Sequence, residues 1–178
     1  MLASIIIPVL NEEKYIGQAI NSCLNQNNIN ENHIEIIVCD GKSTDGTTVI
    51  VRDLMRNHRQ IKLIKNKDKF MSHGFNKALS ITKGKYVMVM SGHSILESDY
   101  VFNCLEIISK NDAKCVSGVM DTIQENYLGK IISLALSTKF GVGNSEFRTN
   151  INYGRYVKTG VFGFYSSEIF LKIGGMDE

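Results

Sequence analysis

Apolar and polar positions along the chain follow two periods in turn, and the alternation predicts strands and helices. Short apolar or β-branched runs predict buried strands at residues 3–9, 34–40, 60–65, 85–90 and 113–120. Apolar residues at helical spacing predict helices at residues 12–26, 43–57, 72–82, 99–110 and 125–138. A Gly-rich irregular stretch, 139–154, precedes a strand at 157–166 and a short helix at 167–175.

This order of elements predicts an α/β fold. Strands that alternate with helices form a mostly parallel sheet with helices on both faces, which is a three-layer α/β/α arrangement. Ligands of such sheets bind at the carboxyl ends of the strands. Polar side chains that directly follow a strand are therefore the candidate site residues.

Length and composition fit one domain with a substantial core. The chain has 178 residues, 43% of them hydrophobic, and a formal net charge of +2, so charge gives no reason to expect nucleic-acid binding. No apolar stretch approaches the roughly 18 residues of a membrane span, and the N-terminus lacks the basic region of a signal peptide. Cysteines in apolar stretches without a C-x-x-C pair favour buried free thiols in a reducing compartment: Cys23, Cys39, Cys104 and Cys115.

Polar residues follow the first two strands. Pro8 ends the first strand's ladder because it has no N–H to donate. Asn11 and Glu12 then stand at a helix N-terminus, where helix capping alone explains them. Asp40 ends the second strand, and a carboxylate there can accept hydrogen bonds from a base or ribose, or needs another partner if it is buried.

Two further turns complete the pattern. Gly41 permits a tight turn after the second strand, and Ser43 or Asp45 caps the next helix. The sequence Ser-Gly-His, 91–93, follows the fourth strand. Because these strand ends share one edge of the sheet, the sequence predicts one crevice there. Neither a G-x-G-x-x-G nor a P-loop motif is present, which argues against a dinucleotide enzyme and a P-loop protein.

Three segments together resemble the family-two glycosyltransferases, a large inverting group with the GT-A fold. They are "SIIIPVLNEEKYIGQAINSCLNQ", "IEIIVCDGKSTDGT" and "GKYVMVMSGHSILESDYV". The later segments "VSGVMDT", "STKFGVGNSEFRT" and "TGVFGFYSSEIFLKIGGMDE" resemble bacterial exopolysaccharide enzymes of the succinoglycan-biosynthesis type. The resemblance implies a single nucleotide-diphospho-sugar transferase-like domain over 1–178, in which 1–105 bind the nucleotide sugar and 106–178 begin the acceptor part.

The resemblance also implies site residues. A nucleotide-diphosphate sugar, usually with uridine, would lie across the strand ends. Asp40 would contact the uracil, and Asn76 would lie near the sugar-phosphate part. The other implied residues border the nucleoside or line its pocket: Pro8, Leu10, Asn11, Glu12, Gly41 and Ser43.

The expected metal motif departs from the family pattern. Relatives generally carry Asp-x-Asp or Asp-x-His after the fourth strand, which holds Mn²⁺ or Mg²⁺ against the diphosphate. Here Ser91, Gly92 and His93 stand at those positions, and a neutral serine is a poor anchor for a hard cation. Three possibilities stay open. A cation binds through His93, the diphosphate and waters; or catalysis is lost or reduced; or basic side chains replace the cation, such as Lys65, Lys69 and Arg148.

The family's catalytic base generally follows a G-G-F-D-E motif, whereas this chain ends at Gly174–Glu178. We therefore expect a C-terminally truncated domain whose base, and whose membrane association, belong to the missing part. The expected activity is inverting transfer of a hexose from a UDP-sugar to a saccharide or lipid-linked acceptor, in the cytoplasm at the inner membrane face. The alternatives are a non-catalytic nucleotide-sugar-binding remnant or scaffold, and a sugar-phosphate nucleotidyltransferase. The sugar, the acceptor and the oligomeric state stay open.

Overall fold

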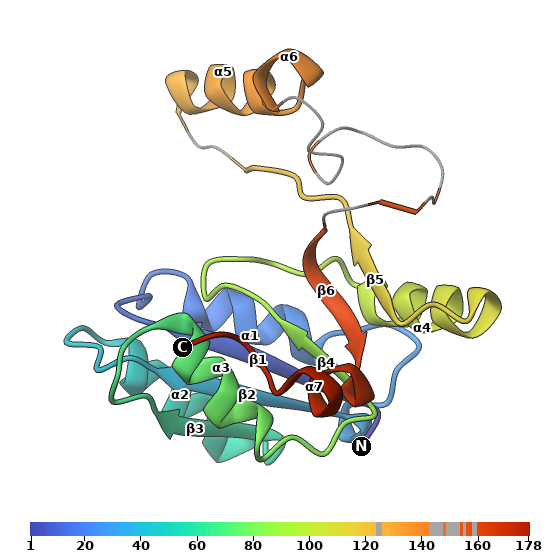
Figure 1. Cartoon of the computed structure of the whole chain (residues 1–178). Helices are drawn as coiled ribbons and strands as arrows, with labels where there is room; N and C mark the ends of the chain where they lie inside the picture. The colour runs from blue at the N-terminus through green and yellow to red at the C-terminus, as the bar shows by residue number, and fades with distance from the viewer. Residues whose placement is uncertain (124–125, 143–147, 149–153, 155, 158–159) are drawn as a thin grey trace. The chain divides into compact units, whose positions relative to one another are not determined.

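A computed structural model describes residues 1–123, 126–142, 148, 154, 156–157 and 160–178 (Figure 1). The contacts within the chain divide it into two compact units. The first unit comprises Met1–Cys115 and Phe164–Glu178, and the second comprises Val116–Gly163. Part of the predicted irregular stretch, 143–147 and 149–153, lies outside the described residues.

One six-stranded sheet has the strand order β3-β2-β1-β4-β6-β5. Its strands are β1 (Ala3–Val9), β2 (Ile34–Asp40), β3 (Ile61–Lys65), β4 (Tyr86–Val89), β5 (Cys115–Gly118) and β6 (Val161–Ser166). Strands β1, β2, β3 and β4 pair in parallel, whereas β6 runs antiparallel to β4. The predicted mostly parallel sheet is confirmed.

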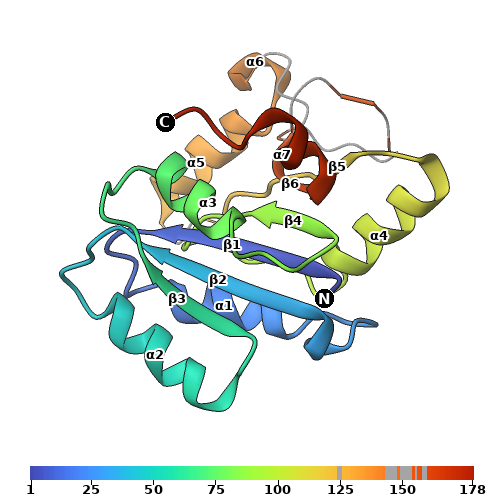
Figure 2. The same cartoon turned by 60° about the horizontal axis from the view of Figure 1, so that its bottom comes forward.

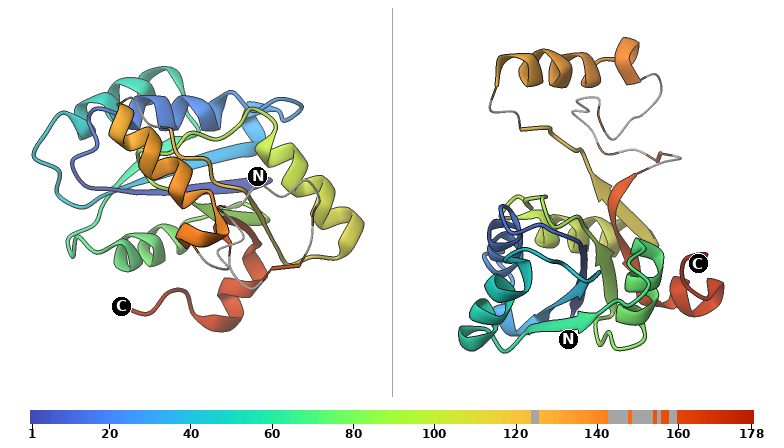
Figure 3. Two further views of the ribbon diagram at one scale, coloured as in Figure 1. Left: turned by 90° about the horizontal axis from the view of Figure 1, so that it is seen from above. Right: turned by 90° about the vertical axis from the view of Figure 1, so that its left-hand side faces the viewer.

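Helices cover both faces of this sheet, as predicted. Figure 2 shows α1 (Ile16–Leu24) and α2 (Thr47–Asn57) on one face, and α3 (Met71–Leu79) and α7 (Ser167–Ile173) on the other; the view from above in Figure 3 agrees. Helix α4 (Tyr100–Asn111) and the short 3-10 turn Glu31–His33 complete the first unit. All seven residues of β2 are buried, as expected for a strand covered on both faces.

The second unit contains α5 (Tyr127–Leu136) and α6 (Lys139–Val142). Asn126 caps α5, because its side-chain oxygen accepts a hydrogen bond of 2.6 Å from the N–H of Gly129. Helix α6 lies within the stretch that the sequence predicted to be irregular. No helix among the described residues is both long and apolar enough to cross a membrane.

Several helix starts differ from the prediction. Helix α1 begins at Ile16 rather than at residue 12, because the N–H groups of Tyr15 and Ile16 both bond the carbonyl of Glu12 in a preceding turn. Helix α2 begins at Thr47 rather than at residue 43. Helix α4 begins at Tyr100 rather than at residue 99, and the side chain of Asp99 at its N-cap position makes no capping bond.

Two smaller expectations need correction. Pro8 lies inside β1 rather than at its end; the β1–β4 ladder stops at Ile6, while β1 stays paired with β2 through Val9. Three of the cysteines are buried free thiols, and burial raises the pKa of Cys23, Cys39 and Cys104 to about 12. Cys115 is exposed, because it begins β5 outside the core.

Candidate active site at the strand ends

The loops after β1 and β2 are joined by hydrogen bonds. The N–H of Asn11 donates to Ser43 Oγ (2.9 Å), and Asn11 Oδ1 accepts from the N–H of Thr44 (2.8 Å). The N–H of Glu12 donates to Thr47 Oγ1 (2.8 Å). Asn11 has a left-handed backbone, with φ of 58°, which asparagine tolerates better than most residues. Asn11 is therefore no helix cap; it holds the two loops together.

A second set of bonds continues this connection one residue further. The N–H of Glu13 donates to Asp45 Oδ2 (3.0 Å), and the N–H of Gly46 donates to Glu13 Oε2 (2.6 Å). Burial acts to raise the pKa of Asp45, but hydrogen bonds from Thr47 and from the N–H of Glu13 lower it below its ordinary value. Asp45 therefore fixes the loop as a carboxylate. The predicted cap at Ser43 or Asp45 is wrong, because Gly46 occupies the N-cap position of α2 and has no side chain to make a capping bond.

Asp40 ends β2 with only 8% of its surface exposed. Its Oδ1 accepts a hydrogen bond from the N–H of Ser43 (3.1 Å). The side chain lines a hollow of about 300 Å³ between α2 and β3, which we call the Asp40 hollow. The other residues of the Asp40 hollow are Thr48, Arg52, Met55, Leu63 and Lys65. The nearly buried carboxylate of Asp40 thus faces an open space that two basic side chains, Arg52 and Lys65, also line.

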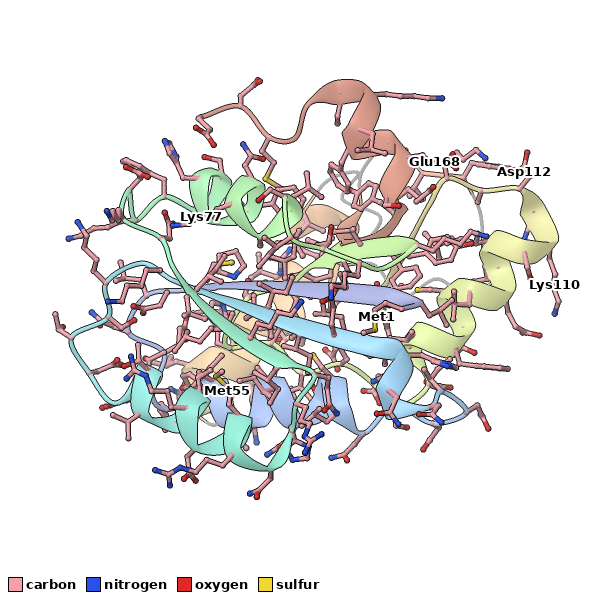
Figure 4. The ribbon with its side chains drawn as sticks, turned by 90° about the horizontal axis from the view of Figure 1, so that it is seen from below. Met1, Met55, Lys77, Lys110, Asp112 and Glu168 are labelled. Atoms are coloured by element: carbon pink, nitrogen blue, oxygen red, sulfur yellow. The ribbon has the colours of Figure 1, made fainter. Side chains whose placement is uncertain are left out.

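The sequence did not single out the α2 wall of this hollow. Thr48, Arg52 and Met55 line the hollow from α2, where Arg52 is exposed, and Figure 4 shows Met55 between α2 and the sheet. Arg52 is held by a hydrogen bond from its guanidinium to Thr48 Oγ1 (3.2 Å). The sequence did contain a signal for this wall. The three residues follow one another at intervals of four and three positions in a predicted helix, and residues at these intervals share one helix face.

Gly41 lies where three backbone segments meet. Its N–H donates to the carbonyl of Val9 (2.8 Å). A Cβ at this position would lie 3.2 Å from that carbonyl oxygen and 3.3 Å from the carbonyl oxygen of Lys69. The glycine therefore allows the ends of β1 and β2 to approach each other closely.

The Ser-Gly-His turn lies against the end of β1. Gly92 is buried, and a Cβ there would lie 2.9 Å from Val9 Cγ1 and 3.1 Å from Glu12 Cγ. His93 Nδ1 lies 2.7 Å from Glu12 Oε1, and 58% of the histidine side chain is exposed. The end of β4 is thus connected to the end of β1, as the shared-edge argument predicted.

The pairing of Glu12 with His93 has a chemical consequence. When Nδ1–H donates to the carboxylate, the neutral imidazole keeps a lone pair on Nε2, which suits a hydrogen-bond acceptor or a metal ligand. No group of three or more His, Cys, Asp or Glu that could hold a metal ion occurs in the part of the chain that the structure describes. A divalent cation would therefore need phosphate and water oxygens besides His93, a mode that Mg²⁺ commonly uses.

The remaining candidates lie around this edge with different surroundings. Leu10 is 45% exposed beside Asn11, and Ser91 is half-buried at the start of its turn. Asn76 lies in α3, where its amide bonds both backbone groups of Met176. The structure thus brings together the ends of β1, β2 and β4, while the side chain of Asn76 contacts the C-terminal segment.

Comparisons with known proteins show the family of this chain. Residues 4–174 match the family Glycosyl transferase family 2. The chain is 32% identical over 173 residues to the dolichyl N-acetyl-alpha-D-glucosaminyl phosphate 3-beta-D-2,3-diacetamido-2,3-dideoxy-beta-D-glucuronosyltransferase of Methanococcus voltae, covering 93% of this chain and 53% of the relative. It is 27% identical over 176 residues to the succinoglycan biosynthesis protein ExoA of Rhizobium meliloti, covering 98% and 52%. The chain spans about half the length of these two relatives.

Solved structures show the same fold. Residues 1–349 of S. aureus TarS in complex with UDP superpose with a TM-score of 0.75 at 21% identity, over 98% of this chain and 49% of that chain. The mannosyltransferase PcManGT from Pyrobaculum calidifontis, in complex with GDP-Man and Mn²⁺, gives 0.70 at 20% identity, over 98% and 47%. This chain belongs to glycosyl transferase family 2 and has the GT-A fold.

Proposed function

We propose that the chain binds a UDP-sugar at the ends of β1, β2 and β4 and serves inverting transfer of its hexose in polysaccharide biosynthesis. The observation that carries the proposal is Asp40, a carboxylate 8% exposed that faces the Asp40 hollow at a strand end. Burying a carboxylate is costly unless a donor pairs with it, and a ligand N–H supplies such a donor. Open α/β sheets bind their ligands at this edge.

Uracil has one N–H between two carbonyl groups. Asp40 would accept the hydrogen bond from that N–H. Arg52 and Lys65, which line the same hollow, carry the donors that the carbonyl oxygens need. The structure of TarS with UDP shows that a protein of this fold binds this nucleotide, which supports the assignment.

The diphosphate gains negative charge when the sugar leaves. A divalent cation, when bound, supplies a counter-charge for it. His93 would hold such a cation through Nε2, and Glu12 would orient the imidazole through Nδ1. Ser91 would offer only a neutral hydroxyl. The structure of PcManGT contains Mn²⁺ together with GDP-Man, which supports the proposal that a cation assists transfer in this fold.

The acceptor is proposed to be a saccharide or a lipid-linked saccharide at the inner membrane face. The Methanococcus voltae relative is named for transfer to a dolichyl-phosphate-linked sugar. A second candidate function is nucleotide-sugar binding without catalysis, in a remnant or scaffold. Ser91 at the position of the expected Asp favours this second candidate.

Titration calorimetry with UDP, with and without Mn²⁺, tests the proposal. Asp40→Asn keeps the side-chain shape but removes the charge, so we expect UDP affinity to fall about tenfold or more. Asp53→Asn on the outer side of α2, where Asp53 pairs with Arg56 in solvent, is the matched control and should bind normally. Equal affinity in the Asp40 and Asp53 variants would contradict the proposal. Turnover of UDP-sugars by the wild-type chain then separates the enzyme from the non-catalytic alternative.

A further inference from the structure

We propose that Asn76 is a positioning residue that holds the C-terminal segment Gly174–Glu178 along α3. Asn76 Nδ2 donates to the carbonyl of Met176 (2.7 Å), and Asn76 Oδ1 accepts from the N–H of the same residue (2.8 Å). One side chain thus satisfies both backbone groups of Met176, a residue 100 positions away in sequence. We call this arrangement the Asn76 latch.

The Asn76 latch also reaches the side chain of Glu178. Asn76 Nδ2 donates to Glu178 Oε1 (2.9 Å), and His73 Nε2 lies 3.7 Å from Glu178 Oε2. His73 and Asn76 share one face of α3 because they lie three residues apart. Both N–H donors of the Asn76 amide are therefore occupied within the protein, so Asn76 keeps neither of them for a sugar or phosphate oxygen.

The local backbone of the segment is shaped for this contact. Gly174 and Gly175 have φ of 82° and 98°, a region that favours glycine. A Cβ on Gly175 would overlap Asn76 Oδ1, whereas a Cβ on Gly174 would meet nothing within 4 Å. The sequence Gly-Gly is thus used in two ways: the first glycine turns the chain after α7, and the second lets the chain approach Asn76.

Packing fixes the segment next to the same helix. Met176 lies against the buried cluster that includes Ile37 and Phe75. Phe170 of α7 packs edge-on against Phe75 of α3, with ring centroids 5.1 Å apart. Hydrophobic contacts therefore bring α7 to α3, and the Asn76 latch sets the direction of the residues that follow.

That direction leads towards the candidate active site. Helix α3 follows directly on a loop that contacts the end of β2: the N–H of Asn66 donates to the carbonyl of Asp40 (2.7 Å). Figure 2 shows the C-terminus at the side of the sheet to which the arrows of β1 and β2 point. We infer that the Asn76 latch holds the carboxylate-bearing end of the segment beside the donor. This effect on transfer rests on the proposed function, whereas the latch itself does not.

Amide hydrogen exchange of the 178-residue chain tests the latch. We expect Asn76→Ala and Gly175→Ala each to speed exchange at Met176 about tenfold, because a hydrogen bond of ordinary strength is lost. Gly174→Ala is the matched control for Gly175→Ala, since it shares the positive φ without the contact to Asn76. Ser80→Ala is the control for Asn76→Ala, because Ser80 directly follows α3 and its hydroxyl donates to the carbonyl of Lys77 rather than to the C-terminal segment. Unchanged exchange at Met176 in both latch variants would overturn the latch.

Donor binding and turnover test its role. We expect Asn76→Ala to keep its UDP-sugar affinity within about twofold of wild type, since the latch places the segment and not the donor. In a full-length chain that carries the expected base, the same change should lower kcat about tenfold and keep KM. If Asn76→Ala instead loses UDP-sugar affinity about tenfold while amide exchange at Met176 stays as slow as in wild type, Asn76 contacts the sugar nucleotide and the inference is refuted. If the wild-type chain binds no uridine nucleotide, the proposed function fails, and the exchange measurement still decides the latch.

Discussion

Asn11 and Asp40 stand at neighbouring strand ends, yet their side chains serve different purposes. Asn11 Oδ1 is engaged by the N–H of Thr44, so it fastens two loops. Asp40 has a bond from the N–H of Ser43 and also faces an open hollow. His93 likewise bonds Glu12 through one ring nitrogen and is more than half exposed. Asp40 and His93 can therefore each still bond a ligand at this edge, Asp40 through its carboxylate and His93 through its second ring nitrogen.

His93 gives a test of the cation at the residue scale. If His93 Nε2 binds Mn²⁺ beside the diphosphate, His93→Ala should abolish the gain in UDP affinity that Mn²⁺ produces. Glu12→Gln should weaken that gain by about tenfold, because the ring loses the carboxylate that orients it. Calorimetry at several Mn²⁺ concentrations measures both effects, with His58→Ala, far along the chain at the end of α2, as the control. A Mn²⁺ effect that survives His93→Ala would remove His93 from the metal site.

At the scale of elements, a buried carboxylate connects three strands and a turn. Glu35 of β2 is 1% exposed. It accepts hydrogen bonds from Ser4 Oγ of β1 (2.6 Å), Lys62 Nζ of β3 (2.7 Å) and the N–H of Lys83 before β4 (2.5 Å). Burial acts to raise the pKa of Glu35, but the bonds from Lys62, Ser4 and Lys83 lower it below the ordinary value.

This lowered pKa predicts acid-dependent stability. The folded state favours the charged form, so the contribution of Glu35 is complete above the unfolded pKa of about 4.3 and is lost as the pH falls through the lower folded value. We expect Glu35→Gln to reduce the free energy of unfolding at pH 7 by about 2 kcal/mol and by less at pH 3. Urea unfolding at both pH values measures this.

An exposed glutamate provides the comparison for Glu35. Glu106 pairs with Lys110 on the outer face of α4, where 47% of its side chain is exposed. Glu106→Gln should therefore change stability by at most a few tenths of a kcal/mol at either pH. An equal loss at pH 7 and pH 3 for Glu35→Gln would show that its carboxylate stabilises the fold by shape alone.

Burial on both sides made some elements predictable from sequence. Residues 3–9 and 34–40 are predicted to the residue, because covered strands carry unbroken apolar runs. The starts of α1 and α2 are missed by four residues each, because Asn11, Ser43 and Thr47 bond across the two loops, a contact that no local pattern shows. The antiparallel pairing of β6 is likewise set by distant residues.

The candidate site was predictable to a similar extent. The positions of Asp40 and His93 follow from strand ends and a shared edge. The partners of these residues do not: the bond of His93 to Glu12, the α2 wall around Arg52 and the contact of Asn76 with Met176 all depend on how helices pack on the sheet.

At the scale of the molecule, the strand order explains why the ends of β1, β2 and β4 meet at one edge of the sheet. The chain adds β2 and β3 on one side of β1 and then returns to place β4 on the other. The loops after β1 and β4 therefore leave neighbouring strands at the point where the order reverses, and His93 of the second loop contacts Glu12 of the first. The strand ends at such a point are where open sheets bind ligands. The chain spans about half of its relatives, and this edge lies wholly within the first unit.

Amide chemical shifts recorded during a titration with UDP test the central claim most directly. If the three loops surround one nucleotide, the amides of Glu12, Asp40, Gly41 and His93 should shift together and yield a single dissociation constant. The hollow of about 370 Å³ beside α5, lined by Thr122 and Lys130 among others, is the internal comparison and should stay unchanged. Shifts confined to one loop, shifts at the α5 hollow alone, or different dissociation constants for the three loops would contradict the account.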